Sequence, residues 1–184
     1  METRNLTTLQ PQTTHQKRLE SDCYVEGYAT TFEPYELYEY DGIKYYEQID
    51  RNAFNNADMS DVIMQYDHTG RVYARQTNKT LFLEVDEHGL FIYADLSKTS
   101  ASRSLFEDID SGLITKMSWA FTVTESSYDS ETRTRKILKV GKVFDVSAVS
   151  IPANNDTEIN ARDFKSFEDE KRKQKLKLKI MLGE

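Results

Sequence analysis

The sequence predicts a β-rich α+β fold in which about eight strands, mostly antiparallel, form a closed or partly closed β-barrel. Short apolar and aromatic runs recur along the chain, and brief turn signals containing Gly, Asp or Pro separate them. Only one internal stretch has the spacing of an amphipathic helix, so the strand–helix alternation of a doubly wound parallel sheet is missing. Because exposed strand edges invite aggregation, closure into a barrel is the simplest arrangement for such a chain.

The first half of the chain is expected to consist of strands and tight turns. A strand at Tyr24–Phe32 ends before Pro34, and Gly27 inside it marks a bulge or a close backbone approach. The tyrosine-rich segment 35–46 turns at Asp41-Gly42, a dipeptide typical of two-residue hairpins. The other elements of this half are a short helical turn at Asn52–Phe54 and strands at Asp61–Tyr66 and Val72–Thr77.

The second half is expected to contain the helix and five further strands. The helix is capped by Thr99 or Ser100, buries Leu105 and Ile109 on one stripe, and ends at Gly112. Two strands, Thr80–Val85 and Leu90–Leu96, are expected to form a hairpin. Three more are expected at Lys116–Phe121, Arg133–Val140 and Val143–Ser150. Gly141 separates the last two of these strands, and Pro152 ends the last one.

Three parts of the chain differ in composition. Residues 1–20 are rich in Thr and Gln and are expected to be a disordered leader. Residues 21–164 form the globular domain, and residues 165–184 form a charged, basic C-terminal tail. The tail has seven Lys/Arg against four Asp/Glu, a charge of +3. Because the whole chain has a net charge of −7, residues 1–164 have a net charge of −10. The overlapping segment Asp163–Leu182 is expected to be a charged helix, although Lys175–Ile180 alternates Lys with Leu or Ile as a strand would.

Composition limits the class of protein. The acidic body argues against a specific nucleic-acid partner, because phosphate-backbone binding needs basic surface. No apolar run approaches the roughly 20 residues needed to cross a bilayer, so no membrane partner is expected. Cys23 is the only cysteine, which rules out an internal disulfide and makes a cytoplasmic setting the default.

The strand that follows Gly112 carries a candidate nucleophile. Because side chains alternate along a strand, Met117, Trp119, Phe121 and Val123 form an apolar face. Ser118 lies on the opposite face, where its neighbours at 120 and 122 are small, so its hydroxyl is accessible to a substrate carbonyl. A serine on an ordinary solvated strand face would have the same pattern, and such serines are common.

A serine becomes a useful nucleophile when an imidazole takes its proton and a third group orients that imidazole. His68 follows the end of a buried strand, where functional residues concentrate, although a lone loop histidine is also compatible with a structural role. Asp145 lies in a mostly apolar strand and is costly to bury without a partner. The partner could be a histidine or one of three nearby cations: Arg71, Arg75 and Lys142.

Four other residues carry candidate side chains. Ser147 shares the predicted face of Asp145 and is either a rival nucleophile or a hydrogen-bonding neighbour. Cys23 could act with His68, but a buried and inert thiol is the better interpretation. His88 lies in a hairpin turn and His15 in the leader. The chain has no zinc-binding motif, phosphate-binding glycine loop or Gly-x-Ser-x-Gly elbow, so no metal and no cofactor are expected.

Many short motifs occur in an order that resembles a known family. They are Glu26–Ala29, Asp50–Phe54, Asp67-His68, Ala74–Thr77, Gly89-Leu90, Gly112–Phe121, Asp145–Ala153 and Asp156-Thr157. Together they span roughly residues 21–160 and resemble the prohead (capsid maturation) serine proteases of tailed bacteriophages. Each motif is weak by itself, and the order of the whole series carries the resemblance.

The resemblance implies a protease-like β-barrel with flanking helices in residues 21–164, similar in fold to herpesvirus assemblins. It implies a serine endopeptidase with Ser118 as nucleophile, His68 as general base and acid, and Asp145 orienting the histidine. Three positions depart from the common pattern: Asp145 where Glu is frequent, Ala120 where Gly is common, and Thr69 where Asp is frequent.

The expected substrate is the major capsid protein or its scaffolding segment, and the protease's own tails are a further substrate. The expected location is the assembling prohead in the host cytoplasm, with a homo-oligomer as a further possibility. The alternative hypotheses are a non-catalytic, scaffold-like capsid-assembly module of the same fold and an unrelated β-barrel that binds a small molecule through its tyrosines.

Overall fold

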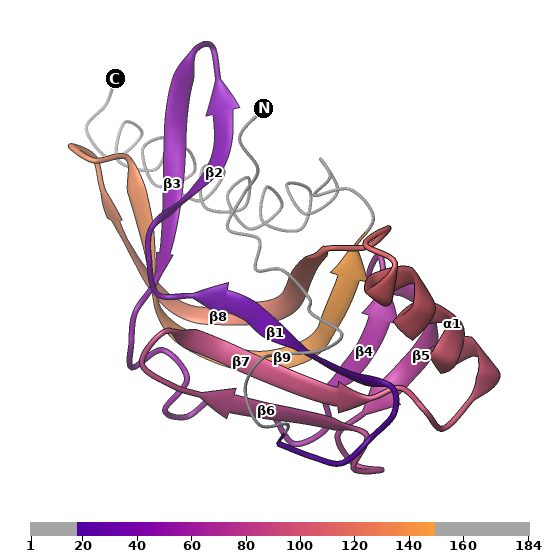
Figure 1. Cartoon of the computed structure of the whole chain (residues 1–184). Coiled ribbons are helices and arrows are strands. Elements are labelled where there is room, and N and C mark those ends of the chain that lie inside the picture. The colour runs from indigo at the N-terminus through magenta and orange to yellow at the C-terminus, as the bar shows by residue number, and fades with distance from the viewer. Residues whose placement is uncertain (1–17, 150–184) are drawn as a thin grey trace, which may run out of the picture. The chain divides into compact units, whose positions relative to one another are not determined.

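The structure is a computed structural model, and it describes residues 18–149. Within this range the chain forms nine strands and one helix, and the strands are divided between a three-stranded and a six-stranded sheet (Figure 1). A single buried apolar cluster draws side chains from both sheets and from the helix. Its most buried members include Val25, Ile49, Val62, Met64, Leu81, Leu90, Ile92, Met117, Ile137 and Val146.

The smaller sheet has the order β1-β7-β6 and is antiparallel throughout. Strand β1 is Tyr24–Thr31, β6 is Leu81–Val85 and β7 is Gly89–Asp95. The β6–β7 hairpin confirms the turn predicted at 86–89. In β1 the register shifts between Tyr28 and Thr30, so the irregularity lies after Gly27 rather than at it.

The larger sheet is built on β9, Thr134–Val149, which pairs with three strands. Strand β8, Lys116–Asp129, runs antiparallel along its whole length. On the other edge, β3 pairs in parallel with residues 134–137 and β4 pairs in parallel with residues 145–148. The remaining bounds are β2, Tyr35–Tyr40; β3, Ile43–Ile49; β4, Ile63–Tyr66; and β5, Thr69–Arg75.

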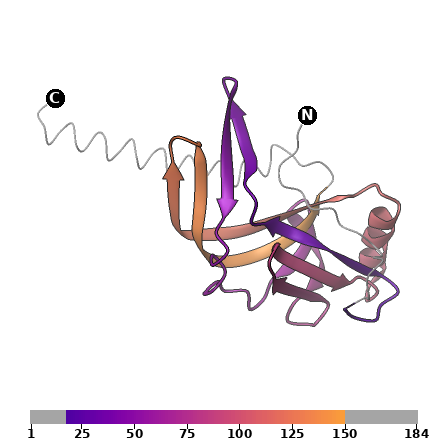
Figure 2. The same ribbon diagram turned by 60° about the vertical axis from the view of Figure 1, so that its left-hand side comes forward.

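The prediction of a closed or partly closed barrel with flanking helices is wrong. Neither sheet closes: β1 and β6 are the edges of one sheet, while β2 and β5 end the path of the other. The physical reason is the pairing pattern: the long strand β9 accepts two separate parallel partners on one edge and β8 on the other, and among the described strands no pairing joins the ends of this sheet to each other. Figure 2 shows the β2–β3 hairpin and the distal part of the β8–β9 hairpin projecting in the same direction, away from the rest of the strands. Within residues 18–149 the only helix is α1, Ser100–Asp110.

The prediction of two strands separated by Gly141 is also wrong, because β9 is continuous through that residue. The glycine is instead a site of close approach to β8. A Cβ atom at 141 would lie 2.8 Å from Thr124 Cγ2 and 3.0 Å from Thr122 Oγ1. The register between β8 and β9 shifts several times around this point, which allows two such long strands to bend together.

The local elements predicted from turn and cap residues are confirmed. Asp41 and Gly42 have positive φ values of 51° and 73°, as a two-residue hairpin turn requires. Thr99 is the N-cap of α1 and its hydroxyl accepts a 3.0 Å hydrogen bond from the Ser102 N–H, while Gly112 follows the helix with φ of 76°. Residues 51–56 form hydrogen-bonded turns, as predicted for Asn52–Phe54.

Several predictions fall on residues outside the described range. They are most of the leader at 1–20, the strand end at Ser150 and Pro152, the charged helix at 163–182 and the basic tail at 165–184. Within the described residues, no helix is long and apolar enough to span a bilayer.

Candidate active site

The turn between β4 and β5 presents His68. Tyr66 pairs with Thr69, so Asp67 and His68 form a two-residue turn, with φ values of 49° and 55°. Two successive positive φ values define the mirror-image turn that matches the twist of paired strands. The Asp67 N–H also donates a 2.9 Å hydrogen bond to the Ala148 carbonyl on β9, which fixes the turn against the neighbouring strand.

Strand β9 supplies an acid and a hydroxyl on one face. Asp145 and Ser147 are two residues apart in the strand, so their side chains point the same way, and β4 pairs alongside them with Ile63 opposite Asp145. His68 Nδ1 donates a 2.7 Å hydrogen bond to Asp145 Oδ1. The two side chains are only 12% and 9% exposed, so the contact is largely shielded from water. Residues 77 positions apart in the sequence are thereby joined.

Strand β8 places Ser118 next to this pair. In the β8–β9 register Ser118 is opposite Ser147 and Ala120 is opposite Asp145, so all four side chains lie on the same face of the sheet. Directly opposed residues on adjacent strands are about 5 Å apart. Ser118 is 9% exposed, and no hydrogen bond joins its hydroxyl to His68 within residues 18–149. Serine–imidazole contacts are often long in proteins without substrate and tighten when substrate binds.

The opposite face of β8 is the apolar face that the sequence predicts. Met117, Trp119 and Phe121 are buried, and the Trp119 and Phe121 rings stack with centroids 3.7 Å apart. The Trp119 ring also packs against Phe54, 5.6 Å between centroids. This apolar anchor holds the strand that carries Ser118.

Two of the three cations expected as partners of Asp145 pair elsewhere. Arg75 forms an ion pair with Asp61, and Lys142 Nζ lies 2.9 Å from Asp58. Hydrogen bonds from Arg75 and Thr77 lower the pKa of Asp61 to about 2. Among the described residues, Asp145 pairs with His68, which is one of the partners that the sequence left open; the contact itself fits a structural ion pair as well as a catalytic one.

The other candidate residues lie apart from this cluster. Cys23 is buried, and this burial raises the pKa of its thiol, as expected for an inert cysteine. His88 lies in the β6–β7 turn with 68% of its side chain exposed, edge-on to the Tyr28 ring. His15 is outside the described residues. Within the described part of the chain, no group of three or more His, Cys, Asp or Glu side chains could hold a metal ion.

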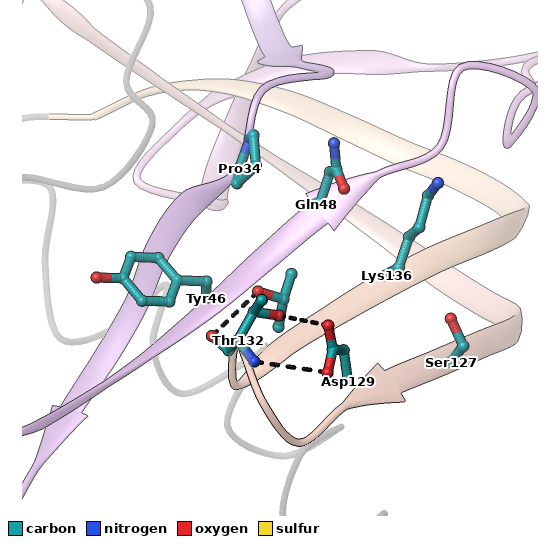
Figure 3. Close-up of a pocket in the computed structure, with 8 residues that line it drawn as sticks. Pro34, Tyr46, Gln48, Ser127, Asp129, Thr132 and Lys136 are labelled. Atoms are coloured by element: carbon teal, nitrogen blue, oxygen red, sulfur yellow. Dashed lines mark hydrogen bonds between the residues drawn. The ribbon is translucent and has the colours of Figure 1, made fainter.

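A pocket of about 520 Å³ is lined by residues of β3 and of the distal part of the β8–β9 hairpin (Figure 3). Ser127, one of its lining residues, is nine positions after Ser118. The pocket wall includes Asp129, which accepts hydrogen bonds from the Thr132 N–H and hydroxyl (Figure 3). Its other lining residues are Pro34, Tyr46, Gln48, Thr134 and Lys136. No histidine is among the residues that line this pocket.

The cluster brings a hydroxyl on β8, a carboxylate on β9 and an imidazole on the β4–β5 turn to one side of three adjacent strands, and these are the residue types that serine hydrolases use. The comparison with family models agrees, because the model of the caudovirus prohead serine proteases matches residues 11–172. The chain therefore belongs to the caudovirus prohead serine protease family, and by family it is a phage capsid maturation protease that acts in the assembling prohead. No curated protein matches the chain, and no solved structure does. The expected similarity to herpesvirus assemblins is thus not shown.

One contact in this cluster was left undecided by sequence reasoning. Ser147 Oγ donates a 2.7 Å hydrogen bond to Asp145 Oδ1, the same oxygen that accepts from His68. The sequence signal for this contact was the spacing of two positions between Asp145 and Ser147, which predicts that both side chains lie on the same face of the strand. That spacing does not distinguish a hydrogen-bonding neighbour of Asp145 from a rival nucleophile.

Proposed function

We propose that the chain is a serine endopeptidase that cleaves the capsid precursor, at its scaffolding segment, inside the prohead assembling in the host cytoplasm. Ser118 is the nucleophile, His68 the general base and then acid, and Asp145 the group that orients the imidazole. The observation that carries this assignment is the 2.7 Å hydrogen bond from His68 Nδ1 to Asp145 Oδ1 on the strand paired with the Ser118 strand. The family match supports the reaction class.

The Asp145–His68 contact determines which imidazole nitrogen does the chemistry. A proton on Nδ1 is held by the carboxylate, so Nε2 is the nitrogen that accepts the Ser118 proton. Ser118 Oγ then attacks the scissile carbonyl carbon, and negative charge develops on the carbonyl oxygen. The imidazolium that forms is stabilised by the adjacent carboxylate, which stays ionised.

Breakdown of the tetrahedral intermediate uses the same proton. His68 delivers it to the leaving amine, the peptide bond breaks, and the acyl group remains on Ser118 Oγ. A water molecule then gives its proton to His68 and attacks the ester, which restores the serine and releases the new carboxyl terminus. Backbone N–H groups are the expected donors to the oxyanion.

An extended polypeptide suits the surroundings of Ser118. Within residues 18–149, β9 is the only strand hydrogen-bonded to β8, so the second edge of β8 has no strand partner there. A peptide can add to such an edge through main-chain hydrogen bonds, with alternate side chains recognised on the flanking surface. This geometry supports a protein segment, rather than a small molecule, as the substrate.

The test is cleavage of purified capsid precursor by the wild-type chain and by Ser118→Ala, with products identified by mass spectrometry. Loss of the nucleophile should lower the rate by about 10⁶-fold if the three residues act as a unit. Ser127→Ala, an exposed serine on the same strand, is the matched control and should cleave at the wild-type rate. Normal cleavage by Ser118→Ala would contradict the assignment.

The same experiment tests the rival function of a non-catalytic, scaffold-like assembly module. The +3 tail at 165–184 would favour docking on an acidic partner. Under that hypothesis the precursor stays uncleaved by the wild-type chain but co-purifies with it, and deletion of the tail abolishes the co-purification. Intact-mass measurement of wild type and Ser118→Ala after expression tests self-processing, because only the wild type should shorten.

A further inference from the structure

Asp145 Oδ1 accepts two hydrogen bonds of equal length, and only one comes from the histidine. The second donor is the Ser147 hydroxyl, at 2.7 Å. Ser147 is fully buried, with 0% of its surface exposed, and it lies in the middle of the sheet. Ser118 is opposite it on β8 and Gln65 is opposite it on β4. The hydroxyl is therefore fixed by strands on both sides.

The orientation of the carboxylate depends on such a second contact. The terminal torsion of an aspartate side chain is broad, so a carboxylate held by a single hydrogen bond can rotate about its axis. His68 lies on the two-residue turn between β4 and β5, whereas Ser147 lies on β9 between β8 and β4. A donor from within β9 holds Oδ1 at a fixed place independently of the turn.

The same observations argue against Ser147 as the nucleophile. A nucleophile must reach a substrate carbonyl, and a side chain with no exposed surface does not. Its hydroxyl proton is already donated to a carboxylate rather than directed to an imidazole nitrogen. Ser118 is the more exposed of the two serines that face each other across β8 and β9.

We infer that Ser147 is a positioning residue: its hydroxyl holds the Asp145 carboxylate in the orientation that directs Oδ1 to His68 Nδ1. This inference rests on the proposed function, since it assigns a role relative to the Ser118, His68 and Asp145 reaction. It adds a fourth side chain, which touches neither substrate nor the reacting atoms.

The test compares Ser147→Ala, Ser118→Ala and Ser102→Ala by steady-state cleavage of capsid precursor. Ser147→Ala removes a hydrogen bond to a charged acceptor. We therefore expect this variant to have a kcat about 10-fold to 100-fold below that of the wild type, with KM within about twofold of the wild-type value. Ser102 is the matched control: it is 1% exposed and donates a 2.7 Å hydrogen bond to the Tyr73 carbonyl, remote from the reaction. Ser102→Ala should keep kcat within about twofold under conditions where it is folded.

Proton NMR of the His68 Nδ1 proton distinguishes a positioning role of Ser147 from a purely structural one, because a purely structural role would leave this signal unchanged. In Ser147→Ala the Nδ1 proton signal should shift or broaden, because the acceptor oxygen has lost its second donor, whereas Ser102→Ala should leave it unchanged. If Ser147→Ala does not fold, Ser147→Cys replaces it, since a thiol fills a similar volume and donates weakly.

The outcomes separate this inference from the proposed function. Inactive Ser118→Ala with wild-type kcat and an unchanged Nδ1 signal in Ser147→Ala would overturn the role of Ser147 alone. Active Ser118→Ala would overturn the proposed function itself. A fall in kcat that only tracks the unfolded fraction of Ser147→Ala would also overturn the positioning role.

Discussion

Replacing Asp145 with Asn removes the charge of the orienting group while keeping its size. Only 9% of the Asp145 side chain is exposed, so an isosteric change should leave the packing of β9 intact. If the amide oxygen faces His68, both hydrogen bonds to Oδ1 persist with a neutral acceptor. If the amide nitrogen faces it, the imidazole is forced into the wrong tautomer for accepting the Ser118 proton.

The size of the effect follows from the lost charge pair. His68 Nδ1 and Asp145 Oδ1 are 2.7 Å apart, and during the reaction the imidazole becomes positively charged. Unit charges about 4 Å apart interact by about 4 kcal/mol at an effective dielectric constant of about 20. That energy corresponds to about a 10³-fold change in rate. We therefore expect Asp145→Asn to lower kcat by about 10³-fold, and more if the wrong tautomer dominates.

The assay is single-turnover cleavage of purified capsid precursor, with circular dichroism to verify the fold of the variant. Asp50→Asn is a suitable control, because Asp50 is also paired with a cation, Lys136, but outside the cluster. A folded Asp145→Asn enzyme that cleaves within about threefold of the wild-type rate would refute the orienting role.

Three further predictions concern the scaffold that holds the site. A Cβ atom at Gly89 would lie 2.1 Å from the Thr30 carbonyl oxygen, so Gly89→Ala should destabilise the chain by about 3 kcal/mol in urea unfolding, and a loss below about 1 kcal/mol would contradict this. Thr99→Ala removes the cap of α1 and should cost about 1 kcal/mol, measured in the same way; no loss would show that the cap is dispensable. The pKa of Asp61 is lowered to about 2 by its contacts with Arg75 and a threonine, so its stabilising effect is present above about pH 4 and is lost as the pH falls through 2. Asp61→Asn should flatten the acid side of the stability profile in that window, and a profile identical to wild type would refute the linkage.

Local chemistry made part of the fold predictable. The Asp41-Gly42 turn, the Thr99 cap and the Gly112 helix stop all depend on residues adjacent in sequence, and each occurs as expected. The same holds for the alternation that buries Trp119 and turns Ser118 to the other face. These features are determined by backbone sterics and short-range hydrogen bonds.

The barrel prediction failed because strand pairing is a long-range property. Nothing near residue 141 indicates that β9 continues through it, since a glycine in a strand pattern is equally compatible with a break and with a close approach. The parallel pairing of β3 and β4 with separate parts of β9 joins residues more than 80 positions apart. Hydrophobic periodicity specifies which face of a strand is buried, but not which strands are neighbours.

The candidate site was also predictable only in part. Sequence order and resemblance suggested that His68 and Asp145 act together, and the structure joins them by a hydrogen bond. The role of Ser118 remains a prediction, because its register places it beside the pair but no hydrogen bond joins it to His68 within residues 18–149. The bond from Ser147 to the carboxylate depended on a side-chain rotamer that no sequence pattern specifies.

The most direct measurement of the central claim is the mass-spectrometric location of a fluorophosphonate adduct. The activated hydroxyl attacks phosphorus and displaces fluoride, so only a serine served by a base is labelled. Trypsin releases Ser118 in peptide 117–133 and Ser147 in peptide 143–162, so the two are separable by mass. We predict an adduct on Ser118 in the wild-type chain and none in His68→Gln. An adduct on Ser147, or equal labelling of Ser118 without His68, would contradict the account.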